Sequence, residues 1–274
     1  MQKTNQFFKV IVLLFLSVLF IDSYSQESFD CFTIIVGKNA SVDGSVLFAH
    51  NEDDYGEHIV NYYEVPRLKH NDREKVLLKN GNKIAQLSET NKYFWLEMPG
   101  MNFADAFMNE YGVCIASNAC PSKEKNPVLT KGGIGYNLRK LMAERAKSAK
   151  QAVKIAGKLI DESGYNSSGR TYSIADPDEA WVLSVVNGKH WIAQRVDDDK
   201  VMIIPNYYTI TNINLSDTNN FLGSDDIIEY AVKNLWYNPD KDGDFNFRKA
   251  YSDENTLNSI NNIGRKWAAI NILS

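Results

Sequence analysis

The sequence predicts an α+β fold in which two strand-rich regions enclose a helical region. Strand-type sequence, rich in β-branched and aromatic residues, covers residues 31–118 and resumes over residues 170–213. Between these regions, apolar residues recur at the three- and four-residue spacings of amphipathic helices. Strands, then helices, then strands favour a layered α+β domain over alternating βαβ units. No linker rich in Pro, Gly or Ser follows residue 25, so we expect one domain.

The individual elements follow from local patterns. The first two strands, 31–36 and 45–51, flank a segment rich in Gly, Asn, Ser and Asp and should form a hairpin with a longer loop. Periodicity places the helices at 135–146, 149–164 and 224–236. The remaining strands are expected at 58–65, 92–98, 112–118, 170–186, 190–196 and 207–213.

The N-terminus has the pattern of a secretory signal. Lys3 and Lys9 precede an apolar run at 10–21, which is too short to span a bilayer comfortably. Small residues at Ser23 and Ser25 allow cleavage after Ser25. We therefore expect an exported protein, periplasmic or secreted, whose membrane contact is through the leader alone. The net charge of −4 lacks the basic character of a nucleic-acid-binding protein.

Cys31 stands five residues beyond this cleavage site, so residues 26–30 form a short propeptide ahead of it. Antiparallel pairing about the middle of the segment 37–44 places Cys31 opposite His50, with residues 51–53 just beyond. An imidazole, an amide and carboxylates would then lie beside the thiol. A nucleophilic cysteine at this position is one interpretation, and a small structural residue is the other.

A catalytic cysteine needs a base, and the residues leave three alternatives open. A histidine could pair with the thiol, but no histidine lies in a papain-like signature. Cys31 could be structural and need no base. Its own backbone amine could serve if the chain is cut before Cys31, because an α-amino group has a pKa of about 7.7–8.0. The short overhang favours the amine. The histidines are His50, His58, His70 and His190.

Two further cysteines are expected to be small core residues. Cys114 and Cys120 lie along one expected strand, roughly 20 Å apart at ~3.3 Å per residue. Disulfide geometry needs Cα atoms within about 7 Å, so these two should not pair.

The stretch CFTIIVGKNASVDGSVLFAHNED resembles the start of the secernin and dipeptidase A family of cysteine peptidases, in the N-terminal-nucleophile hydrolase superfamily. The resemblance continues through GGIGYNLRKLMAERAKSAKQAV, YSIADPDEAWVLSVVNGKHWIAQRV and FNFRKAY. It implies a four-layer αββα sandwich over residues 31–274 and self-processing that exposes Cys31. It also implies hydrolysis of an amide bond in a dipeptide or related small substrate, without a cofactor.

The resemblance assigns roles near the nucleophile. Penicillin V acylases and bile salt hydrolases share the superfamily, and Asp53 matches the aspartate that holds the nucleophile's amine in them. His50 replaces their arginine, and a histidine is mostly neutral near pH 7, so a permanent positive charge is not expected there. His50 and Asn51 are expected to line the substrate site.

Later motifs supply the other site residues that the resemblance implies. Asn118 and Asn206 match site asparagines, whose amide N–H groups can hold the oxyanion of a tetrahedral intermediate. Arg265, in NIGRKW, resembles an arginine near the end of the acylase core motif. Each of the three has an alternative as an ordinary strand-end, turn or surface residue.

An acidic segment at 238–247 has alternating oxygen-bearing side chains, as a calcium loop would. An EF-hand loop needs glycine at position six and glutamate at position twelve. Gly243 meets the first requirement and Lys249 fails the second, which favours a solvated acidic turn and no metal.

Two other functions remain open from the sequence. One is an acylase of non-peptide amides such as penicillin V or conjugated bile acids, and the other is a non-catalytic relative. Family members continue well past Arg265, so this chain is either a truncated product or a short relative whose sheet is completed differently. The expected partner is a small peptide or amide substrate, and a homo-oligomer is left open.

Overall fold

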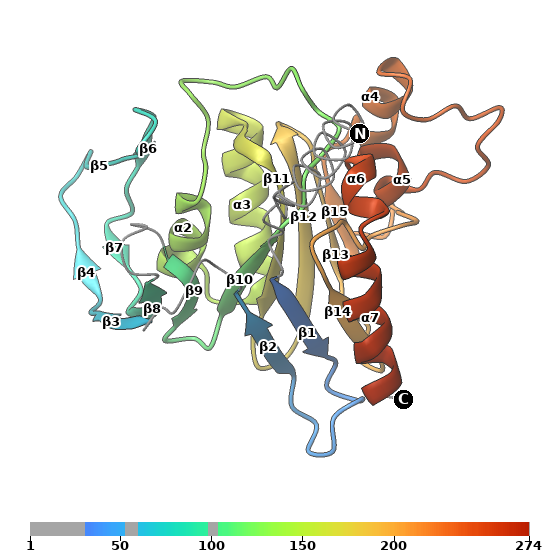
Figure 1. Cartoon of the computed structure of the whole chain (residues 1–274). Helices are drawn as coiled ribbons and strands as arrows, with labels where there is room; N and C mark the ends of the chain where they lie inside the picture. Colours follow the sequence, from blue (N-terminus) through green and yellow to red (C-terminus); the bar gives the residue numbers. More distant parts are fainter. Residues whose placement is uncertain (1–30, 53–59, 98–103, 274) are drawn as a thin grey trace, which may run out of the picture.

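The computed structural model describes residues 31–52, 60–97 and 104–273 (Figure 1). The expected signal peptide and propeptide lie outside them. The strands are β1 (Phe32–Val36), β2 (Leu47–Asn51), β3 (Asn61–Val65), β4 (Leu68–Lys69), β5 (Lys75–Leu77), β6 (Lys83–Ala85), β7 (Glu89–Thr90), β8 (Tyr93–Glu97), β9 (Ala104–Asn109), β10 (Cys114–Ala119), β11 (Tyr165–Ala175), β12 (Ala180–Gly188), β13 (Trp191–Arg195), β14 (Val201–Ile204) and β15 (Phe221–Gly223). The helices are α2 (Asn137–Arg145), α3 (Ala149–Ser163), α4 (Ile227–Lys233), α5 (Phe247–Tyr251), α6 (Glu254–Leu257) and α7 (Ile260–Leu273).

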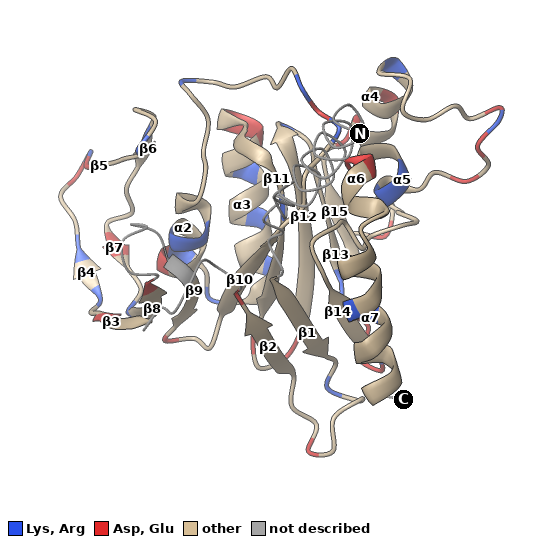
Figure 2. Ribbon diagram, in the orientation of Figure 1, with Lys and Arg blue, Asp and Glu red and all other residues tan. Residues whose placement is uncertain are grey.

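Two antiparallel sheets form the centre of the molecule. The larger has eight strands in the order β15-β13-β12-β11-β10-β9-β8-β3, and the smaller has three in the order β14-β1-β2. Strands β4 with β7 and β5 with β6 form two separate pairs. Figure 2 shows that charged residues lie mainly on the helices and loops around the sheets, whose strands are largely tan.

Helices cover the outer faces of the two sheets. Apolar residues of α2 and α3 share one buried cluster with alternate residues of β10, β11 and β12. The opposite faces of β11 and β12 share a second cluster with Ile35 of β1 and Ile204 of β14. On the far side, Phe32 and Ile34 of β1 face α7. These four layers confirm the predicted αββα sandwich.

The sequence explains why β1 can sit between two layers. Its residues alternate between fully and partly buried, as a strand's period of two requires. Thr33 and Ile35 point to the large sheet, and Phe32 and Ile34 point to α7. Cys31 immediately precedes this strand and is itself 1% exposed. Cys31, at the start of β1, therefore lies in a buried position between the sheets.

The expected strand at 207–213 is wrong. Pro205 has no N–H for a ladder, and Tyr208 is instead anchored by its hydroxyl, which donates to the Val185 carbonyl at 2.7 Å. The carbonyls of Ile210 and Thr211 accept from the backbone of α5. The segment buries its aromatic side chains without extending a sheet.

Among the residues that the structure describes, none of the helices has the length and apolar character needed to cross a bilayer.

Substitution of Gly157 tests the contact between α3 and the large sheet. A Cβ there would lie 2.2 Å from Cζ2 of Trp191. The indole cannot move freely, because its Nε1 donates to Asp161 Oδ1 at 2.8 Å. We expect Gly157→Ala to destabilise the fold by about 1–3 kcal/mol, although alanine is the better helix former.

Gly264→Ala is the matched control for this substitution, because it also lies in a helix and a Cβ there meets nothing within 4 Å. It should raise the free energy of unfolding by up to about 1 kcal/mol. Urea denaturation measures both variants. Equal stabilisation by the two substitutions would contradict the packing described here.

Candidate active site

The hairpin of β1 and β2 brings Glu52 beside Cys31. Thr33 pairs with His50 and Phe32 with Asn51, so Cys31 lies next to Glu52. The predicted pairing of Cys31 with His50 is wrong by two residues, because the loop runs from Gly37 to Val46 and its centre lies further along the chain. A shift of two residues leaves every side chain on its predicted face. His50 therefore stays on the Cys31 side of the strand.

A chain of hydrogen bonds starts at the thiol. Cys31 Sγ donates to Glu52 Oε1 at 3.2 Å, and His50 Nε2 lies 3.1 Å from Glu52 Oε2. On the other side of the ring, His50 Nδ1 lies 2.8 Å from Thr33 Oγ1. The Thr33 hydroxyl donates to Asn118 Oδ1 at 2.8 Å, and Asn118 Nδ2 donates to the Ile204 carbonyl at 3.1 Å. The network thus connects Cys31 with both sheets.

The hydrogen bonds constrain the protons of His50. The Thr33 hydroxyl donates its single proton to Asn118 Oδ1, so it accepts from Nδ1 of His50. Nε2 lies 3.1 Å from Glu52 Oε2, and one proton lies between these two atoms. Whichever of the two groups holds that proton, the His50–Glu52 pair carries no net charge.

A second network holds the backbone of Cys31. Arg265 Nη1 donates to the Cys31 carbonyl at 3.1 Å, across a sequence separation of 234 residues. Its Nη2 donates to Asn206 Oδ1 at 3.2 Å and to Asn262 Oδ1 at 2.7 Å. Asn206 Nδ2 in turn donates to the Ala119 carbonyl at 3.0 Å. The guanidinium of α7 therefore joins the start of β1 to the segment after β14.

The two asparagines differ in their access to a substrate. Asn118 is 0% exposed, beneath Thr33, and both ends of its amide are engaged with protein groups. Asn206 is also buried but lies past the end of β14, beside Arg265. Asn118 therefore joins the sheets, whereas Asn206 lies where the Cys31 backbone is held.

The structure brings five of the predicted site residues together: Cys31, His50, Asn118, Asn206 and Arg265. Asn51 is exposed and, one residue from His50, points to the opposite face of β2. The expected substrate-site position of Asn51 is therefore not observed. Asp53 lies outside the described residues.

Sequence reasoning missed Glu52, Thr33 and Asn262. Glu52 was part of the quoted Asn-Glu-Asp motif, and strand alternation from His50 would have placed it on the same face. Thr33 could have been found in the same way, two residues from Cys31. No local pattern marked Asn262, the one residue of α7 with a buried side chain.

Burial makes the other two thiols poor nucleophiles. It raises the pKa of Cys120 to about 12 and also raises that of Cys114. All three cysteines are free thiols, in agreement with the predicted lack of a Cys114–Cys120 bridge. Cys31 is the one whose described neighbours include the Glu52 side chain, which in turn contacts His50.

Residues 238–244 of the acidic segment form an exposed turn, and the segment ends at the buried Phe247 of α5. Asp242 Oδ2 accepts from the backbone N–H of Asn238, and Asn238 Oδ1 accepts from that of Asp240. These side chains thus bond their own loop. The described part of the chain contains no group of three His, Cys, Asp or Glu residues that could hold a metal ion.

Comparison with known proteins now identifies the class of protein. Residues 30–274 match the model of peptidase family C69, and the chain belongs to this family. A probable dipeptidase from Latilactobacillus sakei is 28% identical over 250 residues, covering 87% of this chain and 52% of the relative. Dipeptidase A from Lactobacillus helveticus is 29% identical over 258 residues, covering 87% and 52%. The chain thus spans about half the length of these curated relatives.

Two solved structures are also similar. Penicillin V acylase from Agrobacterium tumefaciens has a TM-score of 0.40 and 13% identity, over 64% of this chain and 49% of that chain. A variant of conjugated bile acid hydrolase from Clostridium perfringens has a TM-score of 0.39 and 14% identity, over 79% and 63%.

Proposed function

We propose that this protein is a cysteine dipeptidase in which Cys31, exposed as the first residue by removal of residues 1–30, is the nucleophile. The observation that carries the proposal is the position of Cys31, whose thiol contacts Glu52 while its carbonyl is held by Arg265. Membership of peptidase family C69 and similarity to dipeptidases support this chemistry. We further propose that the leader exports the protein before it acts.

The reaction would proceed through an acyl-enzyme. The Cys31 thiolate attacks the carbonyl carbon of the peptide bond, and a C–S bond forms as the carbonyl becomes an oxyanion. The C–N bond then breaks, and the amine leaves with the proton that came from the thiol. A water molecule next attacks the thioester, releasing the acid and restoring the thiol. The sum is one water consumed for one amide bond cleaved.

The base that we propose is the amine of Cys31. In the intact chain this nitrogen belongs to the peptide bond with Asp30 and cannot accept a proton. After cleavage it becomes an α-amine with a pKa of about 7.7–8.0, which suits proton transfer near neutral pH. Asp53 would hold that amine, and the His50–Glu52 pair would orient the thiol.

The oxyanion requires a donor, and we propose the Asn206 amide for that role. Arg265 holds Asn206 Oδ1, and one Nδ2 hydrogen of Asn206 goes to the Ala119 carbonyl, so the second Nδ2 hydrogen is the donor that we propose. An aligned N–H donor at a developing oxyanion is worth about 10²–10³ in rate. Asn118 would act as a positioning residue through Thr33, because it is fully buried beneath that side chain and binds its hydroxyl.

A substrate panel tests the proposed function. Purified protein is incubated with a set of dipeptides, with penicillin V and with a glycine-conjugated bile acid, and the released amine is measured. We expect release from dipeptides. Release from penicillin V or the bile acid alone would replace the dipeptidase with an acylase, and release from none would favour a non-catalytic protein.

A further inference from the structure

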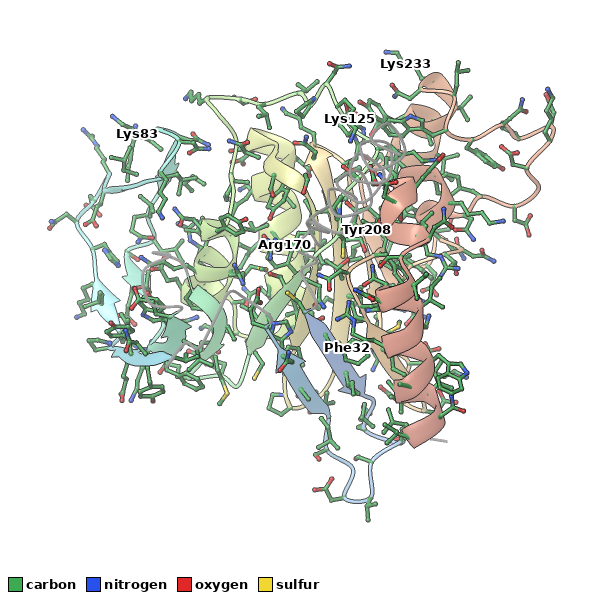
Figure 3. The ribbon with its side chains drawn as sticks, in the orientation of Figure 1. Phe32, Lys83, Lys125, Arg170, Tyr208 and Lys233 are labelled. Carbon is green, nitrogen blue, oxygen red and sulfur yellow. The ribbon has the colours of Figure 1, made fainter. Side chains whose placement is uncertain are left out.

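Arg170 is a buried cation next to the proposed active site that the mechanism above does not use. It lies in β11, paired with Ala119, which follows Asn118. Its side chain is on the helix-covered face of the large sheet, and the residue is 7% exposed. Figure 3 labels Arg170 near the beginning of β1 in that view.

The hydrogen-bonding capacity of this guanidinium is largely unused. Its Nη1 donates to Ser117 Oγ at 3.0 Å, and Ser117 is its only hydrogen-bond partner among the described residues. The Nε group is buried and has no partner. A buried charged group with an unused donor is costly in free energy. Such a group is expected where a ligand supplies the missing acceptor.

The surroundings provide charge but no direct counter-ion. Within the described ranges, no carboxylate lies within 4 Å of the Arg170 nitrogens. Glu52, which contacts the Cys31 thiol, is near enough to act on Arg170 electrostatically. The Tyr136 ring packs on the guanidinium, with its centroid 4.8 Å from the Arg170 Cζ. An anion that reached Arg170 would thus meet a guanidinium with unused donors.

An apolar cavity adjoins this cation. Its volume is about 380 Å³, and Tyr136 forms part of its wall as well as packing on Arg170. Aromatic side chains form part of the wall, and Lys79 and Lys140 add positive charge to it. The aromatic residues are Tyr93, Trp95, Phe107 and Tyr136. The cavity could take one large apolar side chain.

We propose that Arg170 binds the terminal carboxylate of the substrate, while the cavity beside Tyr136 receives an apolar side chain of the same amino acid. This inference rests on the proposed peptidase function and names its substrate class as peptides with a free carboxylate. Arginine suits the task, because its planar fork can bind both carboxylate oxygens at once.

Binding without turnover tests the subsite directly. The Cys31→Ala variant, produced as the mature chain without residues 1–30, is titrated calorimetrically with alanyl-phenylalanine and with alanyl-phenylalaninamide, which differ only in the terminal charge. We expect the free acid to bind about 10- to 100-fold more tightly than the amide. Adding Arg170→Gln should weaken binding of the acid by that factor and leave the amide unchanged. Arg195→Gln, which removes an arginine paired with Glu179 and Asp198, is the control and should change neither.

Several results would overturn the inference. The first is equal affinity for the acid and the amide, and the second is no binding of the acid. The third is an equal loss of affinity for both ligands in the Arg170→Gln variant. That third result would indicate that Arg170 has a positioning role through Glu52. If the double variant does not fold, the comparison of acid with amide in Cys31→Ala alone decides. Turnover by the wild-type protein is a separate readout. Selective binding of the acid without turnover would refute the proposed function alone, and turnover without selectivity would refute the subsite alone.

Discussion

Cys31→Ala is expected to abolish peptide hydrolysis, with a loss of at least about 10³-fold in kcat, while the fold is retained. Removing a nucleophile leaves only the rate enhancement that binding and oxyanion donors supply. The substitution shortens the side chain by one atom at the start of β1 and keeps the backbone contact with Arg265. The measurement is kcat on the best dipeptide of the panel, together with thermal unfolding.

Cys120→Ala is the matched control for this substitution. Cys120 is buried like Cys31, but burial raises its thiol pKa to about 12, so it is not a thiolate near neutral pH. We expect kcat within about twofold of wild type and a small loss of stability from the lost sulfur contacts. Full activity in Cys31→Ala, or loss of activity in Cys120→Ala with an intact fold, would refute the assignment of the nucleophile.

Arg265→Ala should have the second-largest effect, lowering kcat by about 10²-fold and the free energy of unfolding by about 1–3 kcal/mol. The guanidinium joins the Cys31 carbonyl to Asn206 and Asn262, so its loss frees the nucleophile and α7 together. It contacts the Cys31 backbone, so KM should change much less than kcat. Steady-state kinetics and urea denaturation measure the two effects.

Two further variants distinguish this role of Arg265 from a general effect of charge on α7. Lys266→Ala removes the neighbouring cation and should leave kcat unchanged, since the contact of Lys266 within the described residues is with the Tyr207 ring. Arg265→Lys keeps the charge but cannot reach three acceptors with the same geometry, so it should recover only part of kcat. Full rescue by lysine would show that charge, and not the hydrogen bonds, is what the site needs.

The layered fold could be predicted because its signals are local. Helical periodicity in 135–146 and 149–164 places α2 and α3, and β-branched, aromatic runs place β1, β10 and β11. The strand expected at 207–213 does not form, because its apolar residues after Pro205 are buried in a shared cluster without pairing in a sheet. Apolar content alone does not distinguish a strand from a segment that is buried without pairing in a sheet.

The site was predictable where it depends on short motifs and not where it depends on register or long-range contacts. The hairpin motif located Cys31 and His50, but the true length of the loop decided that Glu52, and not His50, stands next to the thiol. The role of His50 Nδ1 as a donor follows from the Thr33–Asn118 bond, which joins two sheets. No sequence pattern reveals such a bond before the sheets are packed.

The contacts of Arg265 illustrate the other limit. A family motif indicated the residue, but its partners include a carbonyl 234 positions earlier in the chain. Arg170 carried no motif at all, and only burial together with an unused Nε singled it out. Both depend on tertiary packing, which brings distant segments together at the start of β1.

The intact mass of the mature protein tests the central claim most directly. We expect a chain that begins at Cys31, with a free amine detectable by N-terminal sequencing, and a Cys31→Ala variant that retains residues 26–30. A wild-type chain that begins at Gln26, is stable over time and still hydrolyses dipeptides would contradict the proposal that the amine of Cys31 is the base.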